Sequence, residues 1–171
     1  MSISIGGVCG IFSPMSHGNF ILREPEYEAL LSVLRKLQVD ASAKVVFLVD
    51  KDGTLLASAG DAVGFDTTSL ASLAAGNIAA TGGLAHLIGE KEFSILFHEG
   101  ERDNMHLSVV AERLILVVVF DRRSSVGLVR LRVRQASARF NDVMLAALAA
   151  SGAEDGGIEE LTEADIESLF K

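Results

Sequence analysis

Two histidines are the first side chains of this sequence whose positions suggest chemistry. His98 and His106 fall in two segments that read as neighbouring strands, and imidazole nitrogens are common metal ligands. With a turn at residues 101–104, His98 is expected opposite Leu107 and His106 opposite Glu99. Because side chains alternate along a strand, the two histidines then point to opposite faces of the sheet. We therefore expect no metal site here.

The remaining polar residues do not assemble an active site. Four aspartates fall in predicted turns and helix caps, where this residue is favoured for backbone reasons: Asp50, Asp52, Asp61 and Asp66. Residues 50–61 do not form an EF-hand loop, since Leu55 stands where glycine is required. The sequence holds no phosphate-binding glycine loop, no G-x-S-x-G and no H-E-x-x-H. It therefore indicates an interaction protein with no catalytic residues, metal or cofactor.

The composition is that of a globular chain with an acidic surface. The chain has 171 residues, of which 49% are hydrophobic, and a net charge of −8. This length predicts one domain with tails, and the negative charge disfavours nucleic acid and anionic membranes as partners. The single Cys9 excludes an intramolecular disulfide, and no apolar run approaches the roughly 20 residues that span a bilayer. We expect a cytoplasmic protein without membrane insertion.

The segment that must organise the fold is residues 66–89, which we predict to be one long helix. Asp66, Thr67 and Thr68 are candidate N-caps, and Gly89 is a candidate C-cap. Its larger apolar side chains are expected to pack on a sheet: Leu70, Leu73, Ile78, Leu84 and Leu87.

Small residues fill the rest of this helix. Gly76, Gly82 and Gly83 each cost about 1 kcal/mol relative to alanine in a helix interior. Ala75, Ala79 and Gly83 follow one another at intervals of four residues and so form one smooth stripe. The stripe has two interpretations. It packs tightly on the protein's own sheet, or the backbone of another protein docks closely on it.

Hydrophobic periodicity predicts the elements around this helix. Helices are expected at 25–39 and 125–149, the second chosen on length because residues 129–134 also alternate like a strand. Strands are expected at 44–50, 54–59, 93–99, 105–111 and 114–120, with Asp52-Gly53 as the hairpin turn between the first two. The order helix, strand, strand, helix, three strands, helix predicts an α+β fold with a five-stranded antiparallel sheet covered by helices.

Both ends of the chain are expected to lie outside a domain of residues 24–150. Residues 1–23 show no clear period and are predicted to be disordered, and a start at Met15 would remove residues 1–14. Residues 151–171 read as a linker and a short amphipathic helix with Ile166, Leu169 and Phe170 on its apolar face. Such a helix is marginal alone and needs a surface, its own or, preferred here, a partner's.

Three arginines of the last long helix allow two interpretations. Arg130 and Arg134 are one helical turn apart, and Arg139 follows. They form a solvated basic face, or they dock an acidic partner.

Several segments resemble the Roadblock/dynein light chain family. They are KVVFLVDKDG at 44–53, DTTSLASLAAGNIAATGGLAHLIGE at 66–90, LVVVFD at 116–121 and SVGLVRLRV at 125–133. The resemblance runs from Tyr27 to the end and is closest to the bacterial MglB branch. Members of that branch partner the Ras-like GTPase MglA in cell polarity and gliding motility.

The resemblance implies a Roadblock/profilin-like sandwich and a homodimer formed through the second helix and the third strand. It also implies that the dimer, concentrated at a cell pole, binds a GTP-loaded GTPase of the MglA type and speeds hydrolysis by ordering the GTPase's own catalytic groups. The GTPase-binding and dimer residues are then expected on the second helix: Leu70, Ala71, Ala75, Ala79, Gly82 and Gly83.

The resemblance gives the C-terminal segment a second contact. Ile166, Leu169 and Phe170 are expected to touch the GTPase away from its nucleotide, with a role in affinity or nucleotide exchange. The first alternative is a non-catalytic Roadblock scaffold dimer in a GTPase-linked complex. The second is a small-molecule sensor, for which the apolar strands offer no convergent polar groups.

Overall fold

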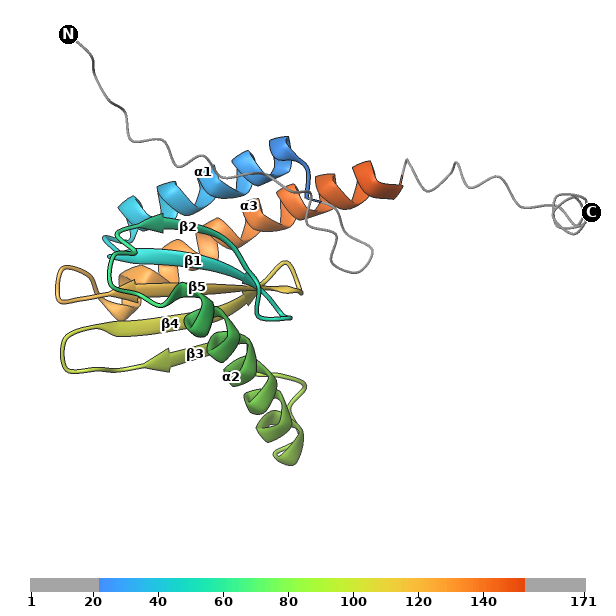
Figure 1. The fold of residues 1–171 in the computed structure, drawn as a ribbon. Coiled ribbons are helices and arrows are strands. Elements are labelled where there is room, and N and C mark those ends of the chain that lie inside the picture. Colours follow the sequence, from blue (N-terminus) through green and yellow to red (C-terminus); the bar gives the residue numbers. More distant parts are fainter. Residues whose placement is uncertain (1–21, 153–171) are drawn as a thin grey trace, which may run out of the picture.

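The computed structural model describes residues 22–152, which form one antiparallel sheet with helices on both faces (Figure 1). The helices are α1 (Glu24–Asp40), α2 (Thr67–Leu87) and α3 (Val126–Gly152). The strands are β1 (Val45–Asp50), β2 (Leu55–Gly60), β3 (Ile95–His98), β4 (Asn104–Val110) and β5 (Leu114–Phe120). The predicted fold class and element order are therefore confirmed.

The sheet has the strand order β2-β1-β5-β4-β3, so β1 and β5 are central and β3 is an edge. Every residue of β1 and β5 is buried, as continuous apolar runs covered on both faces predict. Helices α1 and α3 lie side by side on one face, and α2 crosses the other (Figure 1). The sheet thus separates two hydrophobic cores of different depth.

The core under α1 and α3 is the larger one. It contains Leu30, Leu34 and Leu37 of α1 and Val129 and Phe140 of α3, all buried. Pro25 stands in the first turn of α1, where its missing N–H is no loss. Leu22 also packs into this core, although residues 1–23 were expected to be disordered.

The turn between β1 and β2 brings α2 close to the sheet. Gly53 in this turn has a φ of +85°, a backbone conformation that residues with a side chain rarely adopt. A Cβ on Gly53 would also lie 3.1 Å from the Cα of Ser72 in α2. The predicted hairpin turn is thus also the point where the N-terminal half of α2 meets the sheet.

No helix within residues 22–152 is long and apolar enough to cross a membrane. The predicted C-terminal amphipathic helix, with Ile166, Leu169 and Phe170, lies outside the described residues, as do residues 1–21.

Candidate partner-binding surface

Helix α2 is held to the sheet by its alanines. Its buried residues are Ala71, Ala74, Ala75 and Ala85. The first three pack with Val45, Phe47 and Val49 of β1, and the half-buried Leu70 and Ile78 join the same cluster. Because alanine has a short side chain, the helix axis can lie close to the broad side chains of the strand.

The leucines of α2 are mostly on the opposite side. The exposed fractions are 73% for Leu73, 56% for Leu84 and 82% for Leu87. The prediction that these three anchor the helix on the sheet is wrong. At 100° per residue, the alanine face at positions 71, 74, 75 and 85 turns them away from the sheet.

An outward stripe runs along this exposed side of α2. It consists of Leu73, Gly76, Ala80, Gly83 and Leu87, which are all exposed and follow at intervals of three and four residues. A Cβ added at Gly76 or Gly83 would meet no atom within 4 Å. The described chain therefore gives no packing reason for these two helix-weakening glycines.

The structure divides the site residues that the sequence predicted. Ala71 and Ala75 face the protein's own sheet and cannot touch a partner in this conformation. Leu70 and Gly82 are half-buried, whereas Ala79 and Gly83 are exposed. The proposed stripe of Ala75, Ala79 and Gly83 therefore does not lie on one accessible face. The sequence signal for the outward stripe is a spacing of seven residues, or two helical turns. This spacing pairs Gly76 with Gly83 and Leu73 with Ala80.

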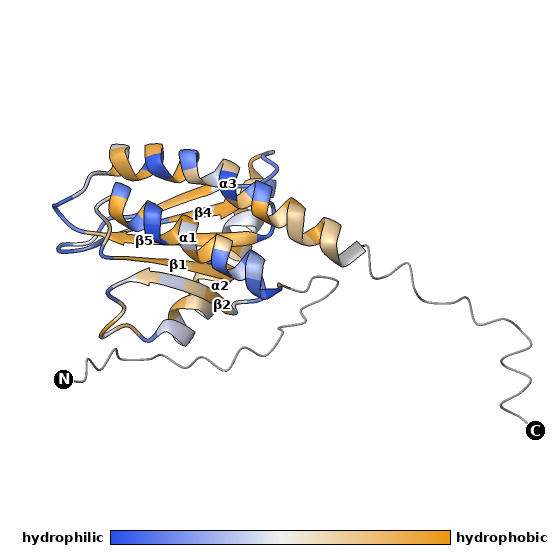
Figure 2. Ribbon diagram, turned by 90° about the horizontal axis from the view of Figure 1, so that it is seen from above, coloured by the Kyte–Doolittle hydropathy of each residue, from blue (hydrophilic) through white to orange (hydrophobic). Residues whose placement is uncertain are grey.

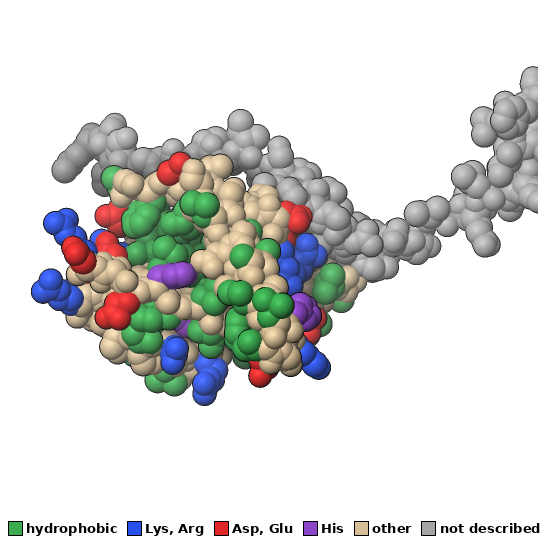
Figure 3. Space-filling model, turned by 90° about the horizontal axis from the view of Figure 1, so that it is seen from below, with side chains coloured by type: hydrophobic (Ala, Val, Ile, Leu, Met, Phe, Trp, Pro, Cys, Tyr) green, Lys and Arg blue, Asp and Glu red, His purple; other side chains and the backbone are tan. Residues whose placement is uncertain are grey.

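The C-terminal half of α2 extends past the edge strand β3 (Figure 1). Strand β3 pairs with β4 only, so its other edge carries backbone groups without a neighbouring strand among the described residues. Ile95 of β3 is 46% exposed, and Ile88 after α2 is 68% exposed. Seen from below the orientation of Figure 1, on the side where β3 and the C-terminal end of α2 lie, hydrophobic and uncharged atoms fill much of the surface and charged side chains lie mostly toward its rim (Figure 3).

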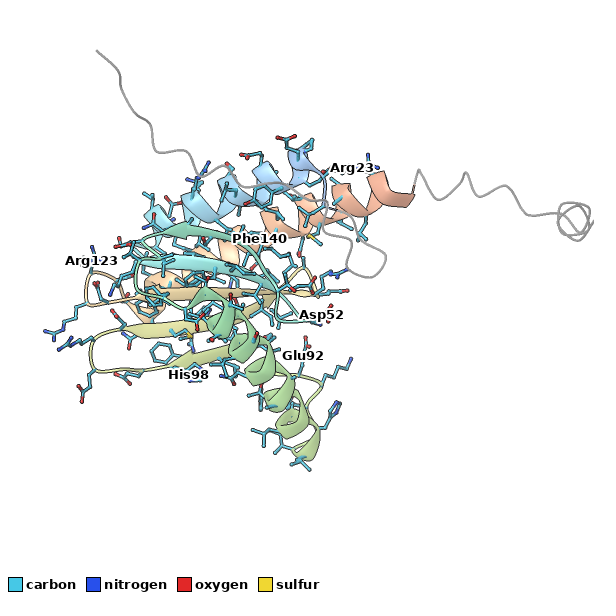
Figure 4. The ribbon with its side chains drawn as sticks, in the orientation of Figure 1. Arg23, Asp52, Glu92, His98, Arg123 and Phe140 are labelled. Atoms are coloured by element: carbon cyan, nitrogen blue, oxygen red, sulfur yellow. The ribbon has the colours of Figure 1, made fainter. Side chains whose placement is uncertain are left out.

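Two polar interactions stabilise α2, one within the helix and one between the helix and β3. Asp66 caps its first turn by accepting hydrogen bonds from the backbone and hydroxyl of Ser69, which hold the pKa of Asp66 below its ordinary value. Further along, Asn77 Nδ2 lies 3.0 Å from Nε2 of His98. His98 is labelled on β3 in Figure 4. The helix is therefore tied to the edge strand that it overhangs.

The two histidines do lie on opposite faces of the sheet, although the register differs from the predicted one. His98 pairs with Met105, and His106 pairs with Phe97, a shift of two residues that preserves the side-chain alternation. His106 is fully buried on the α3 face, and its ring nitrogens have no hydrogen-bond partner within residues 22–152. Burial, with Arg130 nearby, lowers the pKa of His106 to about 4, so the ring is neutral at physiological pH.

The described residues offer little for chemistry of their own. Within residues 22–152, no three His, Cys, Asp or Glu side chains are grouped to hold a metal ion. Asp50 is buried, but it forms an ion pair of 3.3 Å with Arg113, a structural role at the end of β1. The exposed stripe of α2 and the unpaired edge of β3 are instead features that suit association with another chain.

Comparison with known proteins agrees with this architecture. The model of the Roadblock/LC7 domain matches residues 30–120. The solved Myxococcus xanthus MglB is 52% identical, with a TM-score of 0.70 over 74% of this chain and 95% of that chain. The gliding protein MglB of Thermus thermophilus is 31% identical, with a TM-score of 0.71 over 77% and 100% of the two chains.

A third solved structure, described as MglB with a tetrameric arrangement, is 30% identical, with a TM-score of 0.71 over 77% of this chain and 99% of that chain. A search of curated proteins found no match. The family model covers more than half of the sequence, and two of these relatives exceed 30% identity over more than two thirds of it. The chain belongs to the Roadblock/LC7 family.

Proposed function

We propose that this protein is a homodimeric activator of a Ras-like GTPase of the MglA type. The observation that carries the proposal is the outward stripe of α2, where small residues between two leucines face solvent without a contact from the described chain itself. A helix with glycines on its open side lets another backbone approach closely. That its solved relatives are MglB proteins supports the choice of partner.

The dimer is proposed to form through β3 and the overhanging half of α2. Two β3 edges can pair with each other and continue the sheet from one protomer into the next. The same pairing would cover the exposed Leu84 and Ile95. An MglB with a tetrameric arrangement among the relatives supports self-association of this fold.

The protein is proposed to act as a regulator without an active site. Its contribution is to stabilise a GTPase conformation in which the GTPase's own arginine and glutamine surround the γ-phosphate. The activator then supplies shape and position rather than a reacting group. We place it in the cytoplasm, concentrated at a cell pole, in the control of polarity and motility.

Single-turnover GTP hydrolysis by the MglA-type GTPase of the same organism tests this function. The wild-type protein should accelerate hydrolysis strongly, and Ala79→Arg/Ala80→Arg on the exposed side of α2 should abolish at least nine tenths of the acceleration. A matched control, Ala146→Arg/Ala149→Arg, changes two exposed alanines of α3 and should keep it within twofold. Unimpaired activation by the α2 variant would refute the surface assignment.

A non-catalytic scaffold is the second candidate, because a docking surface on α2 would suit a scaffold as well as an activator. Binding of the GTP-loaded GTPase without any acceleration of hydrolysis would select the scaffold.

For the C-terminal segment we propose a modest role in affinity or nucleotide exchange through Ile166, Leu169 and Phe170. Deletion of residues 158–171 should then weaken binding or slow exchange, and a deletion without effect on either would show that the segment is idle.

A further inference from the structure

A groove lies between the outer sides of α1 and α3, on the sheet face opposite α2. Its volume is about 340 Å³. It is lined by Val33, Lys36, Leu37 and Asp40 of α1 and by Arg132, Gln135, Ala136 and Arg139 of α3. Figure 2 shows this face from above, with the two helices lying side by side over the sheet. The buried Val33, Leu37 and Ala136 form its floor, and charged and polar side chains form its rim.

The rim has more positive than negative charge. Lys36 is paired with Asp40 at 3.1 Å, whereas Arg132 donates a hydrogen bond to the neutral amide of Gln135. The Nε of Arg132 is buried without a hydrogen-bond partner in the described residues. Arg139 is exposed on the same rim. Two guanidinium groups of this rim, those of Arg132 and Arg139, thus have no carboxylate partner among the described residues, in a chain whose net charge is −8.

The chain carries a complementary sequence at its C-terminal end. The last 19 residues contain seven carboxylates and one lysine. Its predicted helix has Ile166, Leu169 and Phe170 on one apolar face, and acidic residues such as Glu160 and Glu163 lie in the same segment. An apolar stripe with acidic flanks is what an apolar floor with a basic rim would accept.

The chain is long enough to reach the groove. Arg139 precedes the end of α3 at Gly152 by 13 residues, about 20 Å along a helix. Residues 153–157, which include Gly156 and Gly157, span roughly 17 Å when extended. They can therefore turn the chain back and set residues 158–170 along the groove.

We propose that residues 158–170 occupy the groove between α1 and α3 of the same chain, with their carboxylates paired to Arg132 and Arg139. The tether favours this occupant over an acidic partner protein, because a short flexible link gives an effective concentration on the order of millimolar. The segment would then be held on the face opposite α2 until a competing surface releases it.

Zero-length cross-linking of the full-length protein with a carbodiimide tests the proposal, since it joins only lysine amines and carboxylates in direct contact. Lys36 lies in the groove, whereas Lys51 and Lys91 are exposed elsewhere. Links from Lys36 to carboxylates of residues 154–167 should exceed those from Lys51 or Lys91 at least fivefold. A mixture of unlabelled and ¹⁵N-labelled protein should show these links within one chain.

Charge reversal supplies the control. Arg132→Glu/Arg139→Glu should lower the Lys36 links at least fivefold, and Arg102→Glu/Arg122→Glu, which changes two exposed loop arginines, should leave them within twofold. If circular dichroism shows that the groove variant is unfolded, Arg132→Gln/Arg139→Gln replaces it and should lower the links at least threefold.

Three results would overturn the proposal. They are an absence of excess links at Lys36, links formed mainly between labelled and unlabelled chains, and an equal loss in both charge-reversal variants. The second result would assign the groove to a second copy. Because no GTPase is present in the experiment, its failure is independent of the function proposed for α2.

Discussion

The two faces of the sheet are covered by helices whose buried side chains differ in kind. Under α1 and α3 the core holds large side chains, including Leu30, Leu34 and Phe140. Under α2 the helix contributes buried alanines only, while Leu73 and Leu87 point to solvent. A buried leucine contributes about 1.5–3 kcal/mol of stability. On the α1–α3 face, the leucines are buried within one chain and contribute this stability to the fold. On α2, the exposed leucines could contribute it only by association with another protein.

The largest expected effect is on the α1–α3 face. Phe140 is fully buried, so Phe140→Ala should lower the free energy of unfolding by about 3–5 kcal/mol. Leu145→Ala is the control on the same helix, where the side chain is 66% exposed, and should cost below about 1 kcal/mol. Urea denaturation at one protein concentration measures both. Similar losses for the two variants would contradict the assignment of this core.

The next effect depends on pH and comes from His106 on the same face. Its pKa in the fold is about 4 and its ordinary value is 6.5, so the unfolded chain takes up the proton first as the pH falls. The free energy of unfolding is therefore unaffected by this group above pH 6.5, and it falls by roughly 2–3 kcal/mol as the pH is lowered to 4.

Denaturation of wild type and His106→Leu across this pH range measures the loss, because the variant lacks the titrating group. The variant should lose that much less stability than wild type between neutral pH and pH 4. His86→Gln, at an exposed position of α2, should behave like wild type. Parallel pH profiles for wild type and His106→Leu would show that the buried ring does not resist protonation.

The glycines of α2 should reveal the open face by gaining stability. Gly76→Ala and Gly83→Ala should each raise the free energy of unfolding by about 0.5–1 kcal/mol, because a methyl group meets no atom within 4 Å. They should also weaken association, since the methyl groups hold a docked backbone away. Gly53→Ala, at φ +85°, should instead destabilise the chain. Destabilisation by Gly76→Ala would contradict an open stripe.

The smallest effect concerns a surface ion pair at the end of the sheet. Lys44 Nζ lies 2.9 Å from a carboxylate oxygen of Asp103, and both side chains are about a third exposed. Asp103→Asn should therefore cost less than about 1 kcal/mol, with the difference shrinking at high salt. A larger loss of stability on thermal unfolding that does not depend on salt would contradict the assignment of this pair as a weak surface interaction.

Much of the fold could be predicted because the sequence marks its elements directly. The runs at 45–50 and 114–120 became the central strands, and Asp52-Gly53 became a hairpin turn. The pairing of β3 with β4 was shifted by two residues, since loop residues 99–103 contain no signal strong enough to fix the register. A shift by an even number kept each side chain on its predicted face.

The candidate site was harder to predict than the fold. Composition showed that α2 carries leucines and many small residues, but not which group faces the sheet. Spacing by four favoured Ala75 with Ala79, whereas packing buried Ala75 and exposed Gly76 and Ala80. The groove between α1 and α3 joins residues about 100 positions apart, which helical periodicity cannot bring together.

The central claim is that α2, and not the α1–α3 face, is the docking surface for the GTPase. Amide hydrogen exchange with and without the GTP-loaded GTPase tests it most directly, because exchange reports protection for each helix separately. We predict that protection increases in α2, at residues 73–88, and does not increase at residues 126–140 of α3. New protection at residues 126–140, with α2 unchanged, would contradict the account.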